Sequence, residues 1–250
     1  MNMKKSFFFI VIPVFFVSCF NDKKQIDYSL ENKTDSLTMD SIVNDTTKIL
    51  VAEFPFSFDS TGVLLHPIGL IKASDASKSR TLKISSVYDG DSNDFTIAEY
   101  RGDCLSGNIT NLIFEDISTG KQKLLTNKAL EINNIEYLRL LAHKIKRNYI
   151  MYTVVDMDTN HDGELNQQDI ESLYLSELNG NNFRKITLKN HKLNGGKLIT
   201  QNLRYYFKTQ EDVNKDGVFS QADQYHYNYI DFSGNDYKVV EYFPLDLINK

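Results

Sequence analysis

The chain has few cysteines, which limits the ways in which it can be held together. Only Cys19 and Cys104 occur among its 250 residues. If Cys19 serves another purpose, as argued below, Cys104 has no partner and an internal disulfide is excluded. No histidine lies close to Cys104 in the sequence, so we interpret it as a small core residue or an unreactive thiol.

Basic residues neither dominate nor cluster. The sequence holds 28 Lys and Arg against 33 Asp and Glu, a formal net charge of -5. Binding of nucleic acid requires clustered Lys and Arg, so this balance argues against a nucleic-acid partner. Apart from the first residues, no apolar run is long enough to span a bilayer.

The common catalytic motifs are also missing. The five histidines are scattered without an H-E-x-x-H pair, and neither a G-x-S-x-G elbow nor a phosphate-binding glycine loop occurs. We therefore predict no catalytic residues from the sequence, and a non-enzymatic role is favoured over an enzymatic one.

The N-terminal residues are typical of an exported protein. Lys4 and Lys5 precede the apolar run SFFFIVIPVFFVS, which indicates a signal peptide over residues 1–18. Phe16 to Cys19 resemble a bacterial lipobox, whose cysteine carries the lipid. The resemblance implies a lipid anchor on Cys19 and a place in the bacterial cell envelope, with Phe20 favouring the outer membrane. The alternative is an ordinary signal peptide with an incidental cysteine.

The next segment is polar. Apolar residues are sparse between Asn21 and Lys48, where Asp, Asn, Ser, Thr and Lys dominate. Such a composition buries too little apolar surface to offset the entropy lost on ordering. We predict a disordered tether over residues 19–48 and a single β-rich domain over residues 49–250.

The rest of the chain is rich in segments typical of β-strands, such as YIMYTVV, SLYLSEL and LRYYFKT. Strand–turn–strand segments recur, with Gly120, Gly180 and Gly234 at the turns. Their spacing predicts repeats at about residues 87–130, 131–190 and 191–246, with one small sheet in each. The stretch Glu136–Lys146 is ambiguous between strand and helix.

The middle repeat resembles the blade of TolB-like β-propellers. The matching residues are Leu173–Leu175, Asn179–Gly180 and Phe183–Thr187, although the Ser-Pro-Asp-Gly turn of that family is absent. The resemblance implies an all-β fold of blade-like antiparallel sheets, in the form of a small or incomplete propeller. A β-sandwich or an open stack of hairpins is the alternative.

Two acidic loops interrupt the strands with the same spacing. They read DTNHDGELNQQD from Asp158 and DVNKDGVFSQAD from Asp212. Both have the register of an EF-hand calcium loop, with glycine at position 6, and aspartate at position 12 resembles the dockerin-type variant. The predicted calcium ligands are Asp158, Asn160, Asp162, the Glu164 carbonyl and Asp169 in the first loop, and Asp212, Asn214, Asp216, the Val218 carbonyl and Asp223 in the second.

The chemistry of calcium explains this spacing. Calcium takes six to eight oxygen ligands in a flexible shell, and alternate side chains on a tightly curled backbone can supply them. The strand-like flanks predict loops set in hairpins, each followed by at most a short helical turn. The first repeat has YRGDCLSGN at the equivalent place and lacks the ligands, so two calcium ions are predicted. The alternative is that both loops are Asx-rich turns without metal.

Together these features predict an envelope-anchored calcium-binding lipoprotein. Calcium would be structural, and the domain would bind a protein or a glycan. An envelope hydrolase with a site assembled across blades is the alternative from another class. A calcium sensor is a third interpretation, which is disfavoured because strand flanks leave no helix pair to open.

Overall fold

The computed structural model describes residues 24–30, 38–73 and 97–248. Cys19, the predicted signal peptide and the start of the first predicted repeat lie outside these residues. The elements, in chain order, are η1 (Tyr28–Leu30), α1 (Met39–Val43), β1 (Lys48–Ala52), β2 (Val63–Lys72), β3 (Ala98–Arg101), β4 (Cys104–Asp116), β5 (Gln122–Leu124), β6 (Glu131–Tyr137), α3 (Arg139–Ile145), β7 (Tyr149–Val155), β8 (Glu171–Glu177), β9 (Arg184–Lys185), β10 (His191–Ile199), β11 (Arg204–Glu211), β12 (Gln224–Asp231) and β13 (Lys238–Tyr242).

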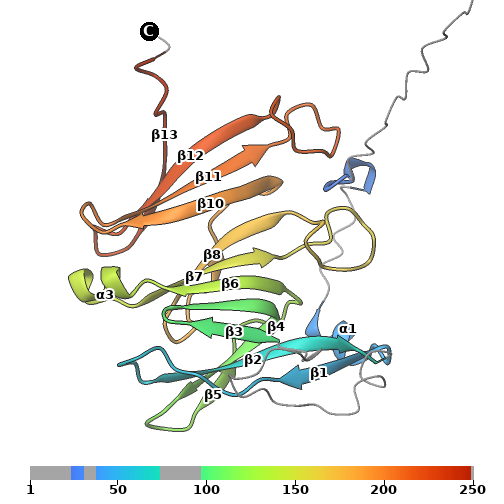
Figure 1. Cartoon of the computed structure of the whole chain (residues 1–250), viewed down its shortest axis with the longest axis vertical. Helices are drawn as coiled ribbons and strands as arrows, with labels where there is room; N and C mark the ends of the chain where they lie inside the picture. The colour runs from blue at the N-terminus through green and yellow to red at the C-terminus, as the bar shows by residue number, and fades with distance from the viewer. Residues whose placement is uncertain (1–23, 31–37, 74–96, 249–250) are drawn as a thin grey trace, which may run out of the picture.

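The described strands form two antiparallel sheets (Figure 1). The first sheet has nine strands in the order β1-β2-β4-β6-β7-β8-β9, with β3 and β5 paired to β4. The second has four strands in the order β10-β11-β12-β13. The prediction of an all-β fold built from antiparallel sheets is therefore confirmed.

The sheets divide the chain differently from the three predicted repeats. The four-stranded sheet coincides with the third repeat, residues 191–246. The first two repeats do not form separate sheets, because β6 pairs with β4 on one side and with β7 on the other. Pairing satisfies the backbone N–H and C=O groups that two separate edges would leave open, so the strands of both repeats join into one sheet.

Strands β7 and β8 are buried on both faces. On β7, Ile150, Tyr152 and Val154 belong to one hydrophobic core, and Tyr149 and Met151 belong to a second. The second core also contains apolar side chains of α3 and of β10, β11 and β12. A strand that is covered on both faces needs no polar face, which explains the nearly continuous apolar sequence YIMYTVV.

The ambiguous stretch Glu136–Lys146 is divided between a strand and a helix. Its first residues end β6, and Arg139–Ile145 form α3, which buries Leu141 and Ala142. The helix ends at Ile145, and the left-handed backbone of its C-cap residue Lys146 (φ 58°) turns the chain toward β7.

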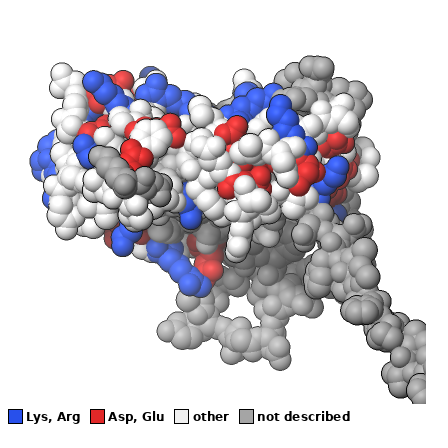
Figure 2. Space-filling view, turned by 90° about the horizontal axis from the view of Figure 1, so that it is seen from above, with Lys and Arg blue, Asp and Glu red and all other residues white. Residues whose placement is uncertain are grey.

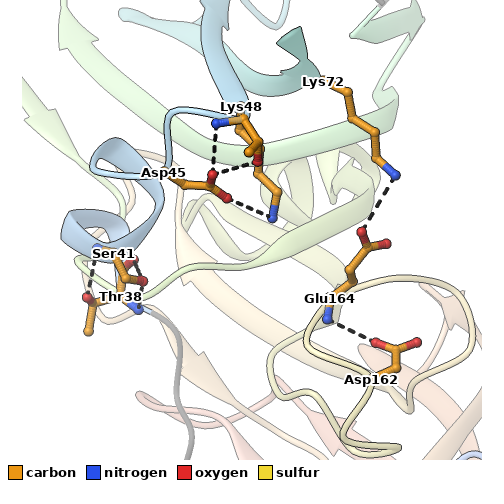
Figure 3. A network of polar contacts seen from close by, with 8 residues as sticks. Thr38, Ser41, Asp45, Lys48, Lys72, Asp162 and Glu164 are labelled. Carbon is orange, nitrogen blue, oxygen red and sulfur yellow. Dashed lines mark hydrogen bonds and ion pairs between the residues drawn. The ribbon is translucent and has the colours of Figure 1, made fainter. Parts of the chain in front are cut away.

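Part of the segment predicted to be a tether lies on the domain. Thr38 and Ser41 form a capping box at the start of α1 (Figure 3), and β1 pairs with β2 along its whole length. Ile26 and Ile42 are only 5% and 8% exposed. These isolated apolar side chains are buried by distant parts of the chain, which the average composition of the segment does not reveal.

No described helix is long and apolar enough to cross a membrane. Figure 2 shows Lys and Arg interspersed with Asp and Glu over one face, without a broad field of one sign on its described part.

Candidate metal centre

Each acidic loop joins the two strands of an antiparallel hairpin. The first lies between β7 and β8, whose pairing ends at Val155 and Glu171. The second lies between β11 and β12, whose pairing ends at Glu211 and Gln224. The loops therefore occupy the same place in two hairpins that belong to different sheets.

The two loops also share their unusual backbone conformations. The residues at position 4, His161 and Lys215, have φ of 58° and 57°. The glycines at position 6, Gly163 and Gly217, have φ of 88° and 84°. Residues with a side chain rarely adopt this left-handed region, so its occurrence at the same two positions shows that both loops curl in the same way.

Four hydrogen bonds from backbone N–H groups to side chains recur in both loops. They run from position 6 to 1, from 5 to 3, from 7 to 5 and from 9 to 12. In the first loop they are Gly163 N to Asp158 Oδ2 (2.8 Å), Asp162 N to Asn160 Oδ1 (3.0 Å), Glu164 N to Asp162 Oδ1 (2.9 Å) and Asn166 N to Asp169 Oδ2 (3.0 Å). In the second they are Gly217 N to Asp212 Oδ2 (2.7 Å), Asp216 N to Asn214 Oδ1 (3.0 Å), Val218 N to Asp216 Oδ1 (2.8 Å) and Ser220 N to Asp223 Oδ2 (2.7 Å).

The carboxylates at positions 1 and 12 are buried. Asp158 and Asp169 are 7% and 1% exposed, and Asp212 and Asp223 are 3% and 5% exposed. Burial raises the pKa of Asp169 and the nearby Asp158 raises it further, although three backbone N–H groups oppose the shift. Charged groups are costly to bury without a partner, so the loops hold negative charge where water cannot fully solvate it.

One of these carboxylates is incompletely satisfied. Among the described residues, Asp212 Oδ1 is a buried side-chain atom without a hydrogen-bond partner. The corresponding atom of the first loop, Asp158 Oδ1, accepts a bond from Asp162 N at 3.1 Å. A buried acceptor left without a partner costs about 1–3 kcal/mol. A cation in the second loop would remove this cost, and the oxygen-only donors of both loops fit calcium.

The side chain of Glu164 is directed away from the proposed ligand set. Its carboxylate pairs with Lys72 on β2 at 3.5 Å, while its backbone N–H donates to Asp162 (Figure 3). The backbone carbonyl at position 7 is the atom that the EF-hand register requires. The pair with Lys72 also connects the first loop to the first strands of the nine-stranded sheet.

The N-terminal segment Lys24–Asp27 lies across both loops. Gln25 N and Ile26 N donate to Gly217 O at 2.7 and 3.2 Å, and Asp27 N donates to Thr159 O at 2.7 Å. The Thr159 hydroxyl donates to Gln25 O at 2.6 Å. The segment therefore bridges two loops that lie more than forty residues apart in the sequence.

A cavity of about 590 Å³ lies beside the first loop, bordered by residues of α1, β2 and β4. Glu131 lies in its wall, and burial, followed by the charges of Asp169 and Glu171, raises the pKa of Glu131 to about 7. This corner of the molecule concentrates carboxylates, and a cation bound in the first loop would lower the local negative potential.

A second group of ligand side chains lies outside both loops. In the described part of the chain, His191, Glu211 and His226 are the one set of three whose ligand atoms all lie within 4.8 Å of one another. The carboxylates of the two acidic loops do not form such a group among the described residues, because they accept hydrogen bonds from backbone N–H groups instead. The sequence prediction missed this group because its members lie on three strands. The sequence shows only the alternation of side chains within each strand. With the β11–β12 register, this alternation places Glu211 and His226 on the same face of the sheet.

Comparison with known proteins gives a limited result. No family model matches the sequence, and no curated protein matches it. Among solved structures, the chain is similar to one described as "The structure of putative TolB from Agrobacterium tumefaciens", with 12% identity and a TM-score of 0.31. The match covers 83% of this chain and 64% of that one, so the chain spans less than two thirds of its length.

Proposed function

We propose that the protein binds two calcium ions, one in each acidic loop, and that this calcium is structural. The observation that carries the proposal is Asp212 Oδ1, which is buried and has no hydrogen-bond partner in the described part of the chain. It belongs to position 1 of a loop whose other oxygen donors stand in the EF-hand register. The first loop repeats the hydrogen bonds and the φ angles of the second, so a ligand that suits one suits both.

The donor atoms favour calcium over other metals. Carboxylate, amide and carbonyl oxygens suit calcium and magnesium, whereas imidazole and thiolate suit transition metals. Magnesium requires a tight octahedral shell, which a flexible twelve-residue loop provides poorly. Asn160 and Asn214 limit the predicted carboxylate ligands of each loop to three, and an affinity in the extracellular range of about 10⁻⁴–10⁻³ M would suffice for an exported protein.

The structural role follows from what the loops join. One loop closes the β7–β8 hairpin, which is buried on both faces, and the other closes β11–β12 in the second sheet. The segment Lys24–Asp27 bonds to Thr159 of one loop and Gly217 of the other. Neutralising the loop carboxylates would therefore stabilise two sheets and the N-terminal segment together.

The direct test is calorimetric titration of the chain with calcium. The unaltered protein should bind two ions, Asp158→Ala and Asp212→Ala should each bind one, and the double variant should bind none. Asp116→Ala is the matched control, because Asp116 accepts hydrogen bonds from Ser118 and Thr119 in a tight turn outside the loops. Absence of calcium binding by the unaltered protein would mean that the loops are turns only.

We also propose that a lipid on Cys19 attaches the protein to the bacterial envelope, at the outer membrane. The support is an apolar run that ends on this cysteine before a polar segment. Cys19→Ser should release the protein from the membrane fraction. A variant that stays bound would point to another anchor.

The proposed partner is a protein or a glycan. Its support is a group of exposed apolar side chains after the edge strand β13, where Phe243, Leu245, Leu247 and Ile248 are 65%, 49%, 84% and 77% exposed. Exposed apolar surface is typical of interaction sites, and these four side chains lie close together in the sequence. A photo-crosslinker at Leu247 in intact cells should give one discrete adduct, which replacing Phe243 and Ile248 with Ser should abolish. An unchanged adduct would place the binding surface elsewhere.

A further inference from the structure

His226 on β12 stands between two carboxylates. Its Nδ1 lies 2.9 Å from Glu241 Oε1 on β13, and its Nε2 lies 3.0 Å from Glu211 Oε2 on β11. A neutral imidazole carries one N–H donor, so it can satisfy only one of these acceptors. The other contact requires either a protonated ring or a cation shared by the ring nitrogen and the carboxylate.

His191 on β10 completes the group. It is 9% exposed, and its ring centroid lies 4.8 Å from that of His226. Its Nδ1 lies 3.4 Å from Thr209 Oγ1, which leaves Nε2 available for another partner. The antiparallel register pairs His191 with Glu211 and Thr209 with His226, so the regular pairing of three strands builds the arrangement.

These side chains line a cavity of about 340 Å³ between the four-stranded sheet and the segment that follows β9. Among the described residues, the carboxylates of Glu211 and Glu241 contribute to the lining, and no Lys or Arg does. The cavity is therefore suited to a positively charged occupant. The apolar part of its wall is formed by Ile186, Leu188, Phe207 and Val239.

We propose that His191, His226 and Glu211 bind a zinc ion whose fourth coordination position opens into this cavity. Two imidazole nitrogens and one carboxylate oxygen are a donor set that zinc commonly takes. With metal–ligand bonds of about 2.0–2.1 Å, two ligand atoms of a tetrahedral site lie roughly 3.3 Å apart. The separation of His226 Nε2 and Glu211 Oε2, 3.0 Å, is already close to that value.

The surroundings of the histidines support the same assignment. A zinc-bound histidine usually donates its other N–H to a carboxylate, a carbonyl or a water, which fixes the orientation of the ring. Glu241 can accept this hydrogen bond from His226 Nδ1, and the Thr209 hydroxyl can accept it from His191 Nδ1. Glu211 directly precedes Asp212, so a zinc site and a calcium loop would share the end of one hairpin while differing in donor chemistry.

Three protein ligands and an open position are typical of catalytic zinc sites, where the bound water ionises near neutral pH. The cavity gives such a water, or an oxygen of a small substrate, room to approach the metal. This site supplies candidate catalytic groups for the hydrolase alternative, for which no sequence motif was found. It does not depend on calcium binding by the loops.

The test is zinc binding by the full chain, purified without a histidine tag and assayed in excess calcium so that the loops do not compete. Elemental analysis after dialysis should give one zinc per chain, and His191→Gln and His226→Gln should each lose it. His66→Gln is the matched control, since His66 Nε2 lies 3.1 Å from Glu115 Oε2 but belongs to no group of three ligand side chains in the described residues. That variant should retain the zinc.

Cobalt substitution gives a second readout that does not depend on a folded variant. Visible absorption of Co²⁺ bound to the unaltered chain should report nitrogen ligands and a low coordination number, and zinc should displace it. A chain that binds no zinc, or variants of His191 and His226 that bind as much as the unaltered chain, would overturn the proposal. A cobalt spectrum of an all-oxygen octahedral site would overturn it as well.

Discussion

Removing calcium should lower the melting temperature of the domain by an amount that the two loops determine. At a free calcium concentration ten times the dissociation constant, each site adds about 1.4 kcal/mol to the free energy of unfolding. Two sites therefore add about 3 kcal/mol. In a domain of this size, 1 kcal/mol shifts the melting temperature by about 2–4 °C. Excess chelator should thus lower it by roughly 6–12 °C.

Scanning calorimetry in chelator, calcium and magnesium measures this shift. Calcium should restore the melting temperature, and magnesium should restore it less. Asp158→Ala should leave about half of the response to calcium, because one loop remains. Asp212→Ala should cost less stability in chelator than in calcium, since the substitution also removes the buried oxygen that lacks a partner.

Asp116→Ala separates a metal effect from the loss of a turn. The Asp116 side chain accepts bonds from Ser118 Oγ at 2.6 Å and from Thr119 N at 2.9 Å. Its removal should destabilise the domain equally in calcium and in chelator. The reasoning would be refuted if the melting temperature of the unaltered chain were the same in both, or if Asp212→Ala responded to calcium as fully as the unaltered chain does.

Two further predictions concern the surroundings of the loops. Gly217→Ala should destabilise the domain more than Gly163→Ala in urea unfolding, because both glycines have positive φ but, among the described residues, only a Cβ at Gly217 would meet another atom, Ile26 O. Equal losses would mean that the N-terminal bridge does not contribute to stability. Glu131, with a folded pKa of about 7 against 4.5, should withdraw stability as pH rises from about 4.5 through 7. In chelator, the free energy of unfolding of Glu131→Gln relative to that of the unaltered chain should therefore increase by about 2–3 kcal/mol between pH 5 and pH 8. A difference that stays constant with pH would contradict the burial of this carboxylate.

Features that depend on neighbouring residues could be predicted from the sequence. The glycine and the aspartates of each loop stand within twelve residues, and their spacing alone predicted the curl that Gly163 and Gly217 adopt. Alternation and β-branched residues predicted the strands, and with them the all-β class, because the side-chain period of a strand is local. Whether calcium occupies the loops and whether Cys19 carries a lipid remain predictions.

Other features arise only when distant segments meet. The sequence predicted separate small sheets, but β4, β6 and β7 pair edge to edge, and no local pattern encodes which edges meet. Composition predicted a tether up to Lys48, yet single apolar residues such as Ile26 are buried by the rest of the chain. A few contacts with a preformed surface can order a segment that could not order itself.

The candidate sites show the same division. The candidate residues of each loop were identifiable because the predicted ligands of one ion follow one another along the backbone. His191, Glu211 and His226 come from three strands, and only the register of β10, β11 and β12 brings them within 4.8 Å. The unpartnered oxygen of Asp212 is likewise a consequence of burial by the folded chain. Spacing along the backbone thus specified the oxygen donors of the loops. Strand pairing and burial decided that a carboxylate oxygen of Asp212 is left without a partner and that a site for a different metal could form on the second sheet.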